Sequence, residues 1–189
     1  MAITRLGGAN AITGTIPQGN IANASLGAVT ALPAAIPTGK VLQVVQTVIT
    51  TAQALSTSTS KIDLPGYSVA ITPSSSSNKV LVSWKIMYCN NSGDAHFLYL
   101  NRGTTEIAKG TTGSIGNQAT VALLQANSNN YWGFEIGGEF LDSPSTTSAT
   151  TYKFQINTYS NYTCHFNRTA RGNADGCFVS TMTATEIGA

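Results

Sequence analysis

The chain has 189 residues, of which 42% are hydrophobic and only 10% are charged. A near-normal apolar fraction excludes a wholly disordered chain, although the charged fraction lies far below the roughly 25% of ordinary soluble domains. The net charge is +2, and no basic block is present that would neutralise a nucleic-acid backbone or an anionic membrane. We therefore expect a folded protein that has no nucleic acid as its partner and does not insert into a membrane.

Residues 1–39 predict an extended N-terminal arm. This segment contains Pro17, Pro33 and Pro37, and its apolar residues follow neither strict alternation nor a helical stripe. The first residues lack the apolar run of a secretory signal, so we expect a protein made in the host cytoplasm and not exported by that route. The spaced aliphatic residues are too many for a solvated linker and predict attachment to another chain: Ile12, Ile16, Ile21, Leu26, Val29 and Leu32.

From residue 40 the pattern changes to a period of two, which predicts an all-β domain over residues 40–189. In the segment 152–157 (YKFQIN) every second residue is apolar. No segment keeps an amphipathic helical stripe for three turns, so sandwich, jelly roll and barrel are the available architectures. We expect an antiparallel, jelly-roll-like β-sandwich. Its predicted strands are 41–51, 67–72, 79–89, 96–101, 105–109, 120–125, 131–141, 151–158, 162–167 and 177–187.

The sequence offers little enzymatic chemistry. Glu135 and Glu139 are the best local pair of carboxylates, but four residues of strand separate their α-carbons by roughly 13 Å, on one face. A glycosidase needs its carboxylates closer, and only a bulge at Gly137–Gly138 would change this register. There is no G-x-S-x-G elbow, P-loop or G-x-G-x-x-G motif. We expect no catalytic residue, no cofactor and no enzymatic activity.

The histidines and cysteines do not predict a metal site. His96 and His165 lack a second histidine at ligand spacing. Cys164, His165 and Cys177 would supply three ligands, but neighbouring residues of a strand point to opposite faces. Together with Cys89 the cysteines number three and are widely scattered, so we expect reduced thiols buried in strands, with pairing of Cys164 and Cys177 left open.

Two clusters place aromatic rings beside amides, a combination suited to carbohydrate because rings stack on sugar faces while amides bind hydroxyls. The alternative is that Trp132 packs in the core, the tyrosines pair across strands and the asparagines fill turns. Glycosylation patterns begin at Asn90, Asn161 and Asn167, but carry little weight without a secretory signal. The predicted receptor contacts are Asn129, Asn130, Tyr131, Tyr159, Asn161 and Tyr162.

Short segments in a fixed order give the chain a family resemblance that spans nearly its whole length. The sequence resembles tail-fibre and other virion structural proteins of tailed bacteriophages, particularly aquatic and marine ones. The resemblance implies a trimeric β-sandwich displayed on the virion and attached through an N-terminal arm, and it brings no catalytic residues. It lies in residues 10–20 (NAITGTIPQGN), 26–29 (LGAV), 39–46 (GKVLQVVQ), 67–82 (YSVAITPSSSSNKVLV), 97–102 (FLYLNR), 151–154 (TYKF) and 180–188 (STMTATEIG).

The expected function is therefore that of a homotrimeric virion protein. Our first interpretation is a tail fibre or spike component that contacts a host receptor, such as a surface glycan, while the arm binds other tail or capsid proteins. Fibres usually carry a long shaft, whereas only about forty residues precede this β domain. The alternative is thus a capsid decoration protein, either a cement or a head fibre. A polysaccharide depolymerase is the least favoured, because carboxylates are sparse.

Overall fold

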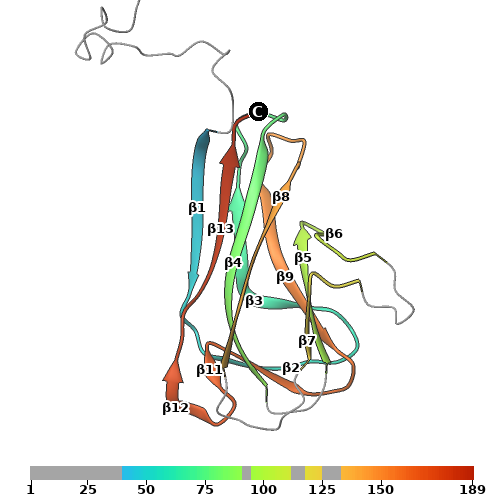
Figure 1. The fold of residues 1–189 in the computed structure, drawn as a ribbon, viewed down its shortest axis with the longest axis vertical. Helices are drawn as coiled ribbons and strands as arrows, with labels where there is room; N and C mark the ends of the chain where they lie inside the picture. The colour runs from blue at the N-terminus through green and yellow to red at the C-terminus, as the bar shows by residue number, and fades with distance from the viewer. Residues whose placement is uncertain (1–39, 91–94, 112–117, 125–132) are drawn as a thin grey trace, which may run out of the picture. The chain divides into compact units, whose positions relative to one another are not determined.

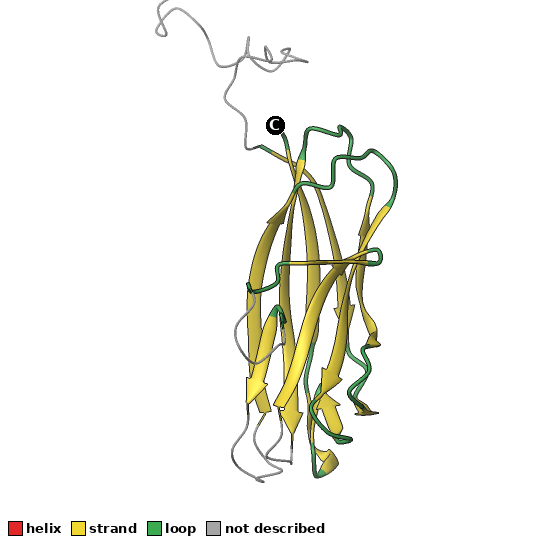
Figure 2. Ribbon diagram, turned by 90° about the vertical axis from the view of Figure 1, so that its right-hand side faces the viewer, coloured by secondary structure: helices red, strands yellow, loops and turns green. Residues whose placement is uncertain are grey.

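The computed structural model describes residues 40–90, 95–111, 118–124 and 133–189 (Figure 1). The predicted arm, residues 1–39, lies outside these ranges, and so do Asn129, Asn130 and Tyr131. Strands and loops make up the described part, which contains no helix (Figure 2). Consequently, no helix in these ranges is long and apolar enough to cross a membrane.

The described residues form a series of antiparallel strands of very different lengths. The bounds are β1 (Val41–Ile49), β2 (Gln53–Ser56), β3 (Ile62–Ile71), β4 (Lys79–Asn90), β5 (Ala95–Arg102), β6 (Thr105–Ile107), β7 (Val121–Leu124), β8 (Gly133–Asp142), β9 (Thr150–Thr158), β10 (Thr163–Phe166), β11 (Arg168–Thr169), β12 (Gly172–Cys177) and β13 (Ser180–Ile187).

Two sheets face each other. In the first, named the β4 sheet, the order is β1-β13-β4-β10-β2, and β8 pairs with β4. In the second, the β5 sheet, the order is β3-β9-β5-β6, and β7 pairs with β5. The strands β1-β13-β4-β8 therefore lie opposite β3-β9-β5-β7, which is the double-sheet arrangement of a jelly roll. The predicted all-β, antiparallel, jelly-roll fold is confirmed.

The core fills the space between the two sheets. Tyr152, Phe154 and Ile156 of β9 are all fully buried, as the alternation of that segment predicts. From β4, Trp84 meets the ring of Phe154 edge to face, with 5.3 Å between the ring centroids. Inward-pointing residues of both sheets thus build one hydrophobic cluster that holds the strand ends in place.

Two buried carboxylates close one end of the sandwich, which we name the carboxylate end. Glu186 of β13 and Asp142 of β8 both lie opposite Val80 of β4. The Oε1 atom of Glu186 accepts hydrogen bonds from the Ser74 backbone (2.6 Å), the Ser74 hydroxyl (2.7 Å) and Asn78 Nδ2 (2.6 Å). Burial alone would raise the pKa of Glu186, but these hydrogen bonds outweigh it and lower the pKa.

Asp142 connects the two sheets at the same end. Its carboxylate accepts hydrogen bonds from Arg102 Nη1 at 2.8 Å to both oxygens and from the Tyr152 hydroxyl at 2.7 Å. Arg102 belongs to β5 and Tyr152 to β9, so one side chain of the β4 sheet holds two strands of the β5 sheet. Burial, followed by the hydrogen bond to Asp142, raises the pKa of the Tyr152 phenol far above its ordinary value.

A second buried polar cluster surrounds Asn167. This residue has a left-handed backbone conformation (φ 55°), and its amide donates to the carbonyl oxygens of Ile49 (2.8 Å) and Thr51 (3.2 Å). The Ser180 hydroxyl donates to Asn167 Oδ1 at 2.6 Å and accepts from the Tyr67 hydroxyl at 3.1 Å. Because Asn167 is fully buried, the glycosylation pattern that begins there is not accessible in the folded domain.

The structure corrects several sequence-based expectations. The strands β2, β11 and β12 were not predicted, and β3 begins at Ile62 instead of at residue 67. The first residues of this strand do not show a regular alternation of apolar and polar residues. The reason is that Gly66 has a positive φ of 81° and that the pairing with β9 shifts register between Asp63 and Ser68. The predicted strand 177–187 is interrupted, since β12 ends at Cys177 and β13 begins at Ser180.

The three cysteines are not joined by disulfides. Cys89 and Cys164 are buried, as expected, and burial raises the pKa of the Cys89 thiol. The expectation of a buried thiol is wrong for Cys177, which is exposed. Its strand, β12, pairs only with β11 among the described strands and does not enter the core between the two main sheets.

Candidate functional site

The strand register brings several chain reversals to one end of the sandwich, which we name the loop end. Cys89 lies opposite Gly133, and Asn90 lies opposite Cys164. In the other sheet Ala95 lies opposite Leu124, and His96 lies opposite Thr158. The described ends of β4, β5, β7, β8, β9 and β10 therefore meet here, at the lower end of the domain in Figure 1. Recognition commonly resides in loops held on such a rigid scaffold.

The connector between β9 and β10 presents two aromatic rings to solvent. The Tyr159 side chain is 70% exposed and Tyr162 is 43% exposed, and Asn161 between them is also exposed. Both rings are therefore accessible from solvent and do not belong to the core between the sheets. Ring faces and an amide in one short connector are therefore available to stack on a ligand and to hydrogen-bond with it.

Hydrogen bonds fix the backbone on both sides of this connector. The Tyr159 N–H donates to the Ala95 carbonyl at 3.1 Å, and the Thr158 N–H donates to the Ser58 carbonyl at 2.9 Å. The Thr57 N–H and hydroxyl both donate to the Tyr162 carbonyl at 2.9 Å. Because the backbone is held before any ligand arrives, less conformational entropy is lost on binding.

The other predicted cluster cannot be placed beside these rings. Asn129, Asn130 and Tyr131 lie outside the described residues, between Leu124 and Gly133. Both of these flanking residues are at the loop end, as their partners Ala95 and Cys89 show. A shared surface with the β9–β10 connector stays a prediction.

Buried polar contacts that the sequence did not indicate lie within the strands next to the loop end. The Tyr88 hydroxyl lies 2.6 Å from His96 Nδ1, and the Tyr99 hydroxyl donates to Asn157 Oδ1 at 3.0 Å. The Lys61 ammonium lies 3.8 Å from the centre of the Tyr99 ring. Burial, with a smaller contribution from the Glu106 charge, raises the pKa of Tyr99. Tyr99 and Asn157 are 58 residues apart, and Tyr88 and His96 lie on two different strands, β4 and β5, so no local motif could have identified these contacts.

The carboxylate pair considered for catalysis lies elsewhere, on the outer face of the β4 sheet. Glu135 forms an ion pair with Lys85 at 2.9 Å, and both side chains are about half exposed. The β4–β8 register is continuous from Val80 to Cys89, so the bulge that would bring Glu135 towards Glu139 is not formed. Both glutamates are exposed, as surface residues of a strand would be.

The candidate metal ligands are also separated. Cys164 belongs to the core cluster, whereas His165 is on the opposite face of β10, level with Cys89. Burial, with the nearby Arg168 charge, lowers the pKa of His165, and its Nδ1 has no hydrogen-bond partner among the described residues. Within the described ranges no three His, Cys, Asp or Glu side chains are grouped to hold a metal ion.

Comparisons with known proteins give matches only among solved structures. No family model and no curated protein matches the sequence. A chain from the T13 particle of infectious bursal disease virus (IBDV) is similar over 77% of this chain and 37% of its own length, at 11% identity and a TM-score of 0.41. A chain from the Gx strain of that virus is similar over 78% of this chain and 40% of its own length, at 11% identity and a TM-score of 0.33.

A third similar chain comes from the disulfide-linked pili of Bacillus endospore appendages. It is 11% identical, has a TM-score of 0.30, and the match covers 78% of this chain and 91% of that one. The chain thus spans well under half of the two viral chains and most of the appendage chain. At these scores the likenesses assign no function to this protein.

Proposed function

We propose that this protein is a non-enzymatic structural component on the surface of a bacteriophage particle, where it binds host surface glycan as a homotrimer through the loop end. The observation that carries the proposal is the pair of exposed rings, Tyr159 and Tyr162, on a connector with a fixed backbone. The sequence resemblance to phage tail-fibre proteins supports the location on a virion.

Trimerisation would raise the overall affinity for a glycan that each subunit binds weakly. A single pair of rings binds a sugar weakly, but linked sites raise the overall affinity by about 10² to 10⁴ without a new contact. If the protein is a trimer, light scattering on the full chain should give about three times 19.7 kDa. A monomer at micromolar concentration would argue against the trimer.

Adsorption to host cells tests the binding role of the rings. Tyr159→Ala removes the ring, and Tyr159→Phe is the matched control that keeps the ring and removes only the hydroxyl. If stacking dominates, the alanine variant should lower adsorption severalfold, whereas the phenylalanine variant should retain most of it. Equal adsorption by all three proteins would refute receptor binding at this connector.

Capsid decoration is the second candidate, and the outer face of β1 favours it. Leu42, Val44 and Val48 are 43%, 59% and 54% exposed, and such an apolar strip suits permanent packing on a neighbouring protein. Labelled antibodies on intact virions distinguish the two candidates, because a fibre is labelled at the tail and a cement protein over the head. Incubation with host polysaccharide tests the third possibility, since only a depolymerase would shorten the polymer.

A further inference from the structure

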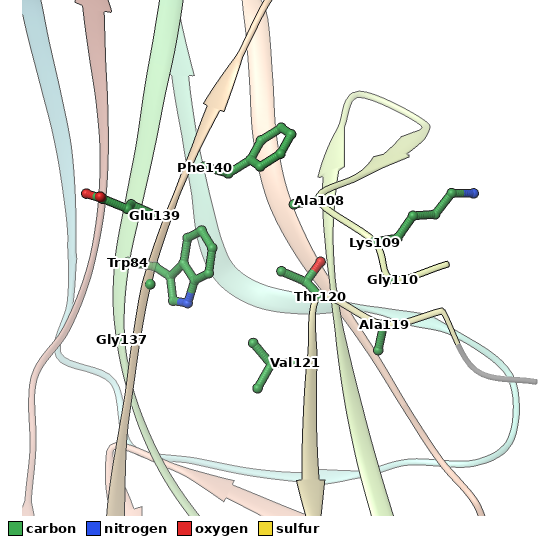
Figure 3. A pocket seen from close by; sticks show the side chains of 11 residues that line it. Trp84, Ala108, Lys109, Gly110, Ala119, Thr120, Val121, Gly137, Glu139 and Phe140 are labelled. Atoms are coloured by element: carbon green, nitrogen blue, oxygen red, sulfur yellow. The ribbon is translucent and has the colours of Figure 1, made fainter. Parts of the chain in front are cut away.

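One side of the sandwich is open between the edges of its two sheets. Among the described strands, β8 pairs only with β4, and both β6 and β7 pair only with β5. A pocket of about 600 Å³ lies between these edges, and Figure 3 shows its walls. We name it the Trp84 groove. Its lining includes Trp84, Ala108, Ala119, Val121, Gly138 and Phe140.

Trp84 brings an unsatisfied polar group to this groove. The residue is only 7% exposed, and its indole Nε1–H has no hydrogen-bond partner among the described residues. Figure 3 shows the indole nitrogen on the side of the ring towards Val121. An indole N–H is a donor only, and burying it unpaired is destabilising. The described lining of the groove therefore provides no acceptor for this N–H.

The indole is held in this position by its neighbours. A β-carbon on Gly138 would come within 2.4 Å of the Trp84 ring, so the ring occupies the space that a side chain would take. The ring of Phe154 meets the indole from another side. Because the indole is buried among these neighbours, a sugar would find no free ring to stack on, and a glycan is a poor occupant.

The walls favour an uncharged, apolar occupant. The Thr120 hydroxyl is already used, since it accepts from the Leu100 N–H at 2.8 Å and lies 3.4 Å from the Ile107 carbonyl. Lys109 and Glu139 are exposed and carry opposite charges, so the rim attracts neither sign. Gly137 and Gly138 leave the β8 edge without side chains, which lets another backbone approach closely.

An extended peptide satisfies all of these features together. Its backbone can pair with the open β8 edge, one carbonyl can accept the indole N–H, and an aliphatic side chain can fill the apolar pocket. The chain itself contains a suitable segment, because residues 6–39 include no charged residue and several isoleucines and leucines. At about 3.3 Å per residue this segment extends for roughly 110 Å, which is ample to reach another molecule.

We infer that the Trp84 groove binds the N-terminal segment, residues 6–39, of a neighbouring copy. This segment precedes β1, which is the edge of the β4 sheet opposite to β8. A molecule that donates from one edge and accepts at the other forms head-to-tail contacts, and such contacts close into a ring when the rotation between neighbouring copies is one third of a turn, as the proposed trimer requires. The inference rests on the proposed trimer and names the surface that holds it together.

Photo-crosslinking in the full chain tests the occupant. Ala119→p-benzoylphenylalanine places the crosslinker at the groove, and an equimolar mixture of unlabelled and ¹⁵N-labelled chains is assembled before irradiation. We expect crosslinked peptides from residues 6–39, about half of them joining a light to a heavy chain. Crosslinks only within one chain, or only to other segments, would overturn the inference.

A pair of matched variants tests the contribution to assembly. Ala119→Arg places a charge in the groove, whereas Ala122→Arg places the same charge on the exposed face of β7 nearby. We expect Ala119→Arg to weaken the trimer about tenfold or more and Ala122→Arg to leave it unchanged, with thermal melts confirming that both fold. If Ala119→Arg leaves the trimer intact, the groove is not the assembly surface, although the trimer itself stands. If the wild-type protein is a monomer, the proposed trimer is wrong.

Discussion

The carboxylate end of the sandwich buries its polar groups, whereas the loop end exposes its aromatic ones. At the first, Glu186 and Asp142 are only 1% and 6% exposed and each accepts three or more hydrogen bonds. At the second, the Tyr159 side chain is 70% exposed and only its backbone is held by the strands. Polar side chains are thus buried at the carboxylate end, whereas aromatic side chains are exposed at the loop end.

This difference indicates how the two ends divide their tasks. A buried carboxylate with several donors cannot be removed without leaving those donors unpaired, so the carboxylate end is committed to stability. An exposed ring on a fixed backbone contributes little to folding. The residue type at such a position is therefore not constrained by stability and can be suited to a ligand. The four predictions below test this division.

The largest effect is expected from Asp142→Ala. This change removes the acceptor for Arg102 and for the buried Tyr152 hydroxyl, and it should lower the free energy of unfolding by about 3 kcal/mol. Asp63→Ala is the matched control, because Asp63 pairs with Lys153 at 2.7 Å but is 57% exposed and should cost less than about 1 kcal/mol. Urea unfolding measures both, and equal losses would contradict the assignment of stability to the carboxylate end.

Glu186→Gln should have the next largest effect. The amide keeps one acceptor oxygen for Ser74 and Asn78, whose three hydrogen bonds all go to Oε1, but it removes the negative charge that strengthens them. We therefore expect a loss of about 2 kcal/mol in unfolding free energy. Glu106→Gln provides the control, since the Glu106 carboxylate pairs with Lys61 at a part-exposed position. A Glu186→Gln protein as stable as the wild type would show that this carboxylate is not needed to close the end.

The two ends should also respond to pH in different ranges. The pKa of His165, in β10 at the loop end, is lowered from 6.5, so its contribution to stability is complete above pH 6.5 and is lost as the pH falls towards the lowered value. The pKa of Glu186 is lowered from 4.5, so its contribution is present above pH 4.5 and is lost as the pH falls through the folded-state value.

Denaturant unfolding at a series of pH values separates these contributions. His165→Gln should flatten the dependence of stability on pH just below 6.5, and Glu186→Gln should flatten it below 4.5. His165→Gln should not change the pH range assigned to Glu186, and Glu186→Gln should not change the range assigned to His165, because the two side chains are at opposite ends of the sandwich. If neither variant changes its own range, other groups dominate the acid response.

The smallest effect on stability is expected from Tyr159→Ala. With the ring exposed, the change should alter the free energy of unfolding by no more than about 0.5 kcal/mol, even where it lowers host adsorption. Differential scanning calorimetry of this variant beside Asp142→Ala makes the comparison direct. A large fall in melting temperature would mean that the ring supports the fold, and the contrast between the ends would be lost.

Much of the fold follows from local alternation, whereas both ends depend on distant partners. The segment 152–157 predicts β9 and its buried rings because a period of two is visible in six residues. Glu186 shows no such signal, since its donors Ser74 and Asn78 are more than 100 residues away. The exposed tyrosines were predicted as a cluster, but the anchoring of their backbone by Thr57 required the structure.

The position of β13 between β1 and β4 also sets the order of events during synthesis. β1 pairs with no described strand except β13, and the pairing joins residues as far apart as Val41 and Ile187. The apolar edge of β1 therefore emerges from the ribosome well before its partner exists. Such long-range pairing makes folding slow, and until residue 187 has been made, nascent chains held close together have an open strand edge through which they can associate wrongly.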